Sequence, residues 1–86
     1  MIRIETSERR DLVIFALSGR IEADDLPELK RLTESYSKPV VLDLTDVKLV
    51  DREAITFLAN LETDNAKITN CPPYIREWIV RERDQS

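Results

Sequence analysis

The chain opens with alternating apolar and polar residues and then becomes continuously apolar. Residues 2–7 alternate with the period of two that is typical of a strand with one face in solvent. Residues 12–17 are all apolar, which favours a strand covered on both faces. The polar residues 8–11 predict a turn, so we expect an antiparallel hairpin whose second strand ends at Ser18 and Gly19.

A helical pattern follows the hairpin. It is expected to begin near Asp24, with Pro27 tolerated because the N–H groups of a first helical turn have no intrahelical acceptor. Its apolar face carries Leu26, Leu29, Leu32 and Tyr36. Pro39 stops the helix at residues 35–38. Residues 40–44 are mostly apolar and begin with two β-branched valines, which predicts a central parallel strand.

The second half of the chain predicts two further helices. Residues 45–50 are expected to form a loop, with Asp51 as the N-cap of a helix that ends at residues 64–65. The apolar stripe of this helix is Ile55, Leu58 and Leu61. Residues 66–69 predict a short strand. A last helix runs to about residue 83 and is expected to bury Ile75, Trp78 and Ile79.

Length and composition restrict the kind of protein. A chain of 86 residues forms one domain and is too short to enclose a deep substrate cavity as well. The first residues lack the apolar core of a signal peptide, and no apolar run approaches the length of a membrane span. A single cysteine, Cys71, cannot form an internal disulfide. These features favour a cytoplasmic protein without membrane insertion.

Composition also argues against several functions. The formal net charge is −4 and both signs are interspersed, so nucleic acid is not expected as a partner. Histidine, the usual general base and commonest transition-metal ligand, is absent. The one glycine, Gly19, is too few for a loop that cradles phosphate. We therefore expect no cofactor and no enzymatic activity.

Three segments, in order, resemble a known family. They are LSGRIEADDLPELKRL, VVLDLTDVKLVDREAITFL and AKITNCPPYIREW. Together they resemble the STAS domain family, whose best-known members are bacterial anti-sigma factor antagonists. Gly19, Pro27, Asp43 and Asp51 stand at matching places of the family pattern. The resemblance implies one STAS-like α/β domain over residues 1–86, with a mixed sheet of about four strands, an N-terminal antiparallel hairpin, parallel crossovers and three helices.

The sequence departs from the family at its phosphorylation site. The family carries serine or threonine where this chain has Glu53, and Arg52 and Ala54 replace the flanking serine and glycine. Glu53 has no hydroxyl to accept a phosphoryl group. It is either a permanent charge in place of phosphate or an acid in a first helical turn, which the helix dipole favours by roughly 0.3–1 kcal/mol. The last strand and helix of the family are expected to be missing or collapsed into residues 74–83.

The candidate interaction surface is the N-terminal end of the second long helix. Its residues are Asp46, Asp51, Arg52, Glu53 and Thr56. The resemblance implies a non-catalytic protein-protein interaction module in bacterial regulation, with an anti-sigma kinase-like protein or a transporter component as partner. The alternatives are a phosphorylation-independent cytoplasmic transporter subunit and a structural domain. The structural domain would form a homodimer through residues 66–69 at a sheet edge.

Four further features have two interpretations each. Asp51 is favoured as an N-cap over a catalytic acid. Asp43 and Asp46 could join Asp51 around Mg²⁺, but no phosphate-binding loop accompanies them. Cys71 lies at a helix start, where a thiol pKa can fall, although a half-buried structural cysteine is the favoured interpretation. Trp78, with Tyr74, is an exposed anchor in one interpretation and part of the core in the favoured one.

Overall fold

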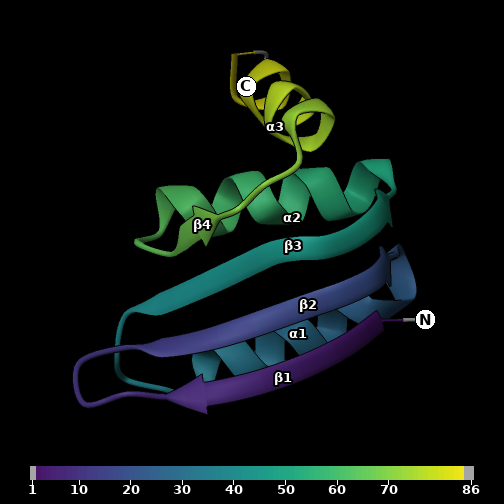
Figure 1. Ribbon diagram of the computed structural model, residues 1–86. Helices are drawn as coiled ribbons and strands as arrows, with labels where there is room; N and C mark the ends of the chain where they lie inside the picture. Colours follow the sequence, from purple (N-terminus) through teal and green to yellow (C-terminus); the bar gives the residue numbers. More distant parts are fainter. Residues whose placement is uncertain (1, 85–86) are drawn as a thin grey trace.

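Four strands form one mixed sheet in the computed structural model, which describes residues 2–84 (Figure 1). The sheet order is β1-β2-β3-β4. The strands are β1 (Ile2–Glu8), β2 (Val13–Ile21), β3 (Val40–Val50) and β4 (Lys67–Thr69). β1 and β2 are antiparallel, whereas β2, β3 and β4 are mutually parallel. The predicted hairpin and the mixed sheet are thus confirmed, and β4 occupies an edge as expected.

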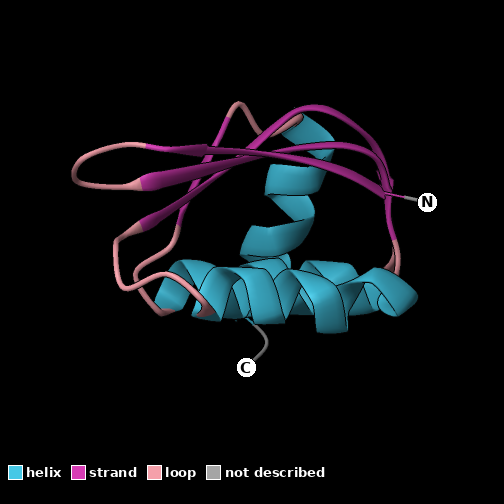
Figure 2. Cartoon of the chain, turned by 90° about the horizontal axis from the view of Figure 1, so that it is seen from below, coloured by secondary structure: helices cyan, strands magenta, loops and turns pink. Residues whose placement is uncertain are grey.

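Two long helices lie along one side of this sheet, and a third stands across them and reaches the level of the strands (Figure 2). The helical elements are a short 3-10 helix, η1 (Ala23–Asp25), followed by α1 (Leu26–Glu34), α2 (Arg52–Thr63) and α3 (Pro73–Asp84). Pro27 occupies the first turn of α1, as predicted. Residues 74–83 are helical throughout. The molecule therefore has two layers, and the second face of the sheet carries none of the described helices.

The interpretation of residues 12–17 as a strand covered on both faces is wrong. Val13, Phe15 and Leu17 of β2 are buried against the helices, but Ile14 and Ala16 on the other face are only half-buried. Ile14 lies opposite Val41 of β3, so the two side chains shield each other in the absence of a second helical layer. The apolar run therefore reflects contacts between neighbouring strands rather than a second cover.

The prediction of a loop at residues 45–50 is also wrong, because β3 continues to Val50. Its eleven residues pair with the nine of β2, and the two extra residues are accommodated at two shifts of register. Such bulges break the alternation of a strand. Leu44, Val47 and Val50 are buried at every third position, a spacing that does not have the period of a strand.

The hairpin's second strand likewise does not end at Ser18 and Gly19. β2 continues to Ile21, and Gly19 lies at the second shift of register. The φ angle of Gly19 is 89°, in the left-handed region that favours glycine. Gly19 therefore does not end the strand. It adopts a left-handed conformation at the second shift of register between β2 and β3.

The core fills the space between the sheet and the helices. Its largest fully buried side chains are Phe15, Leu17, Ile21, Leu29, Leu42, Leu44, Ile55, Leu58, Ile75 and Ile79. Tyr36 packs edge-on against Phe15, with 5.7 Å between ring centroids. The predicted helix faces are confirmed in their central residues, while Leu61 and Trp78 are half-buried against the core.

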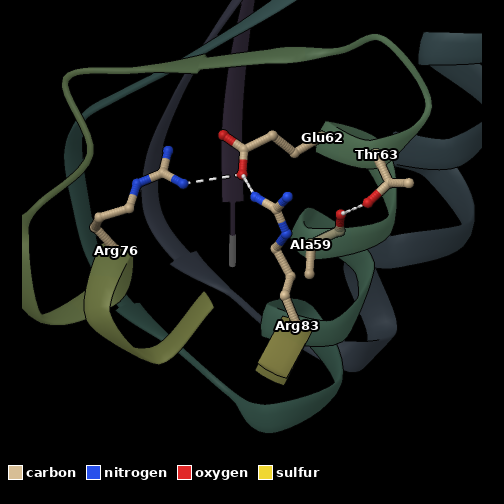
Figure 3. A network of polar contacts seen from close by, with 5 residues as sticks. All are labelled: Ala59, Glu62, Thr63, Arg76 and Arg83. Carbon is tan, nitrogen blue, oxygen red and sulfur yellow. Dashed lines mark hydrogen bonds and ion pairs between the residues drawn. The ribbon is translucent and has the colours of Figure 1, made fainter. Parts of the chain in front are cut away.

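An ionic cluster attaches α3 to α2 (Figure 3). One carboxylate oxygen of Glu62 accepts hydrogen bonds from Arg76 at 2.9 Å and from Arg83 at 3.2 Å. The hydrogen bond from Arg76 holds the pKa of Glu62 below its usual value, although partial burial opposes this. Glu77 and Arg81 form an ion pair on the exposed side of α3. The Glu62 cluster therefore gives the last helix a specific polar attachment in addition to its buried isoleucines.

We expect Glu62→Gln to lower the free energy of unfolding by about 1–2 kcal/mol at neutral pH, because Arg76 and Arg83 lose a charged acceptor that is only 20% exposed. The folded-state pKa of Glu62 is depressed, so its contribution is present above its ordinary pKa of 4.5 and is lost as the pH falls through the lower folded-state value. Chemical denaturation across this pH range measures it.

The matched control is Glu77→Gln, which removes an exposed helical pair of the same chemistry. This variant should change the stability less than Glu62→Gln does, because solvent screens the pair. Equal losses from the two variants, or a Glu62→Gln difference that persists at low pH, would contradict the role of the cluster.

Candidate functional site

Asp51 joins two corners of the fold through its carboxylate. One oxygen, Oδ1, accepts a hydrogen bond from the backbone N–H of Ala54 at 2.8 Å, which confirms Asp51 as the N-cap of α2. The other, Oδ2, accepts from the backbone N–H of Ala23 in η1, also at 2.8 Å. The N–H of Asp51 donates to the carbonyl of Ile21 at 3.2 Å. Asp51 therefore fixes the start of α2 to the end of β2.

The local sequence explains why the chain turns at both corners. After Ile21, the N–H of Glu22 donates to the carboxylate of Asp25 at 2.9 Å, which closes the turn into η1. After Val50, Asp51 is extended and caps the first turn of α2. Since β2 and β3 are parallel, both corners lie at the same end of the sheet, where these strands have their C-termini.

Arg52 and Glu53 project from the first turn of α2 into solvent. Both residues are exposed, and neither forms an ion pair with another residue of the described chain. Glu53 occupies a position where the helix dipole favours an acid, as the simpler interpretation of this residue requires. The first turn of α2 thus presents one cation and one anion at consecutive positions.

Thr56 lies one turn further along α2 and faces α3. Its hydroxyl is 3.3 Å from the carbonyl of Arg52 and 3.2 Å from the carboxylate of Glu82. A small hollow of about 120 Å³ between the two helices adjoins Thr56 and Glu82. Thr56 therefore links the start of α2 to α3.

Asp46 lies apart from the other four predicted residues. It is exposed on β3 opposite Ser18, on the face of the sheet that bears no helix. Four residues lie between it and Asp51, a span of at most roughly 16 Å along the strand. The structure thus brings Asp51, Arg52, Glu53 and Thr56 together and leaves Asp46 outside the group.

Leu49 was missed as a member of this surface. It lies three residues before Arg52, pairs with Arg20 across the sheet and is 52% exposed. No local pattern marks Leu49, because β3 buries Leu44, Val47 and Val50 only as a result of its two register shifts against β2. We define the α2 N-terminal surface as Leu49, Arg52, Glu53 and Thr56, with Asp51 beneath them.

Asp43 has a structural role at the first bulge. Its Oδ1 accepts from the hydroxyl of Thr45 at 2.6 Å, from the N–H of Thr45 at 3.0 Å and from the amide of Asn70 at 3.3 Å. The hydroxyl bond contributes most to holding the pKa of Asp43 below its usual value. Residues 2–84 contain no group of three metal-ligating side chains, so Asp43, Asp46 and Asp51 do not converge.

Cys71, Trp78 and Tyr74 contact other parts of the fold. Burial raises the pKa of the half-buried Cys71 thiol, an effect that the nearby Arg76 only partly opposes. Trp78 packs against the core. Tyr74 is exposed, and its hydroxyl donates to the carbonyl of Lys48 at 2.6 Å.

A second hollow, of about 450 Å³, lies far from the α2 N-terminal surface. Its walls come from the C-terminal ends of α1 and α2 and include Tyr36, Phe57 and Leu61. Because α2 starts where β3 ends, this hollow and the N-terminus of α2 are at opposite ends of the sheet (Figure 1). No helix of residues 2–84 combines the length and apolarity that a membrane span requires.

We expect Asp51→Ala to lower the free energy of unfolding by about 2 kcal/mol, because it removes the N-cap of α2 and the acceptor of the Ala23 N–H together. Asp51→Asn should lose less, since its amide oxygen can still accept one of the two bonds. Urea denaturation measures both. Asp46→Ala is the control and should leave the midpoint unchanged; a similar loss there would contradict the special role of Asp51.

The comparisons with known proteins concern the fold. No family model and no curated protein matches the sequence. The structure is similar to that of an uncharacterized protein of the DUF3478 family with a SpoIIAA-like fold from Shewanella loihica PV-4, with a TM-score of 0.56 and 17% identity over 98% of this chain and 78% of that chain. The predicted STAS-like fold is confirmed, because the chain is similar in structure to this protein with a SpoIIAA-like fold.

Proposed function

We propose that the protein is a non-catalytic interaction module that binds another protein through the α2 N-terminal surface. The observation that carries this proposal is that, at the start of α2, Asp51 has a structural role and its two neighbours do not. Both oxygens of Asp51 are engaged by backbone N–H groups, whereas Arg52 and Glu53 beside it are exposed. Asp51 thus acts as an anchor, and the neighbouring charges are free for a partner.

The surface has the mixed chemistry of a protein contact. Leu49 contributes an exposed apolar side chain three residues before the charged pair Arg52 and Glu53. An apolar contact supplies affinity, and charges beside it supply orientation and discrimination between partners. The positions of these residues on β3 and α2, rather than on a long loop, limit the entropy lost on binding.

The titratable groups elsewhere support a role without catalysis. Asp43 and Glu62 have pKa values below their usual range because they accept hydrogen bonds, which favours fixed charged acceptors over proton carriers. The raised pKa of Cys71 disfavours a thiolate nucleophile. None of these groups lies on the α2 N-terminal surface.

Glu53 makes the proposed surface independent of phosphorylation at this position. A carboxylate accepts no phosphoryl group and carries one charge, against about −1.5 to −2 for a phosphate. The partner therefore meets the same charge at all times. By the resemblance to STAS domains, the partner is an anti-sigma kinase-like protein or a cytoplasmic component of a transporter.

Affinity purification from the source cell tests the surface. The double variant Arg52→Ala/Glu53→Ala should lose a partner that the wild type retains, because both exposed charges disappear. The matched control is Glu28→Ala/Arg31→Ala, which removes an exposed pair of the same residue types from α1. Recovery of the same proteins in equal amounts with all three baits would overturn the proposal.

A single substitution separates the two interpretations of Glu53. If its charge contacts the partner, Glu53→Gln should weaken binding by roughly three- to tenfold, because the neutral amide keeps the shape and loses the charge. Isothermal titration with the recovered partner measures this, and thermal unfolding of the same variant reports the helix-dipole effect separately. An unchanged affinity with a lower midpoint of unfolding would leave Glu53 as a helix acid only.

A further inference from the structure

β1 is a long and regular sheet edge. It has seven residues, contains neither proline nor glycine, and pairs with β2 from Ile2 to Glu8 without a shift of register. Natural edge strands are normally shortened, bulged, interrupted by proline or charged, because their free N–H and C=O groups can pair with another strand, and of these protections β1 has only its charged side chains. Figure 1 shows β1 at the border of the sheet with no described element beyond it.

The two faces of β1 have different chemistry. Ile2 and Ile4 lie opposite Gly19 and Leu17 of β2 and pack against the core, although both remain half-buried at this border. Arg3 and Glu5 lie on the face without helices and are exposed. Neither charge forms an ion pair within the described chain, whereas Glu8 at the end of β1 is paired with Lys38 at 2.7 Å.

The strand is complementary to a second copy of itself in one antiparallel register. A two-fold axis perpendicular to the sheet, midway between the two copies of Ile4, places these residues opposite each other on the helix side. It also places Arg3 of each copy opposite Glu5 of the other on the free side, which gives two cross-strand pairs of opposite charge. An axis between the two copies of Arg3, or between the two copies of Glu5, would instead oppose two like charges.

We infer that the protein forms a homodimer through antiparallel β1–β1 pairing centred on Ile4. The four strands of each copy then form one continuous eight-stranded sheet with all helices on the same side. The pairing satisfies the free backbone groups of β1 and covers the exposed parts of Ile2 and Ile4. It does not use the α2 N-terminal surface, because β2 lies between β1 and Leu49 of β3.

The opposite edge is less suited to such pairing. β4 has three residues, and prolines follow at positions 72 and 73. A strand of this length offers few backbone groups to a partner, so β1 is the stronger candidate for self-association than the edge at residues 66–69.

Charge reversal tests both the edge and its register. We expect wild-type protein to show a concentration-dependent dimer in sedimentation velocity, and Arg3→Glu and Glu5→Arg each to weaken dimerisation by about tenfold or more, because every cross-strand pair becomes repulsive. The double variant Arg3→Glu/Glu5→Arg restores opposite charges and should dimerise like the wild type. An equimolar mixture of the two single variants should form a heterodimer, since each then supplies what the other needs.

Each alternative outcome overturns the inference. A wild-type protein that remains monomeric at all concentrations excludes the dimer. Single variants that dimerise as well as the wild type place the contact on another surface, such as β4. Weakened single variants without recovery in the double variant or the mixture exclude this register. Circular dichroism of every variant confirms that the exposed substitutions leave the fold intact, and partner binding through α2 is measured independently.

Discussion

The arrangement of this molecule depends on the carboxylate of Asp51. Its two oxygens hold the backbone N–H groups of Ala23 and Ala54, which belong to segments 31 residues apart in the chain. A part-buried N–H without an acceptor is costly, so these bonds select one geometry for the corner where β2 ends and α2 begins. The same geometry determines where the backbone of Arg52 and Glu53 lies.

The second constraint is a sheet with helices on one face only. β2 and β3 shield each other on the free face through pairs such as Ile14 and Val41, and two bulges in β3 change which of its residues point inward. Bulges bend a strand and increase its twist, which fits β3 to the helices beneath it. The same bulges expose Leu49 beside the start of α2. Local irregularity in one strand thus shapes the proposed surface.

The titratable groups with altered pKa values have structural surroundings. The carboxylates with altered pKa values accept hydrogen bonds that hold a bulge or a helix in place, and the single thiol is stabilised in its neutral form. The proposed α2 N-terminal surface and the β1 edge do not overlap, because β2 lies between β1 and β3, so the two proposed contacts are compatible with each other. In the proposed dimer, each copy presents its own α2 N-terminal surface to a partner protein.

The sequence by itself determined the hairpin, the helices, the edge position of residues 66–69 and the N-cap at Asp51, because these depend on local periodicity and capping. It also placed Arg52, Glu53 and Thr56 at a helix start. Only the tertiary structure decided that β3 reaches Val50, that Leu49 is exposed, and that Asp51 also binds Ala23. Bulges and distant hydrogen bonds depend on which strands become neighbours, and no pattern within one segment carries that information.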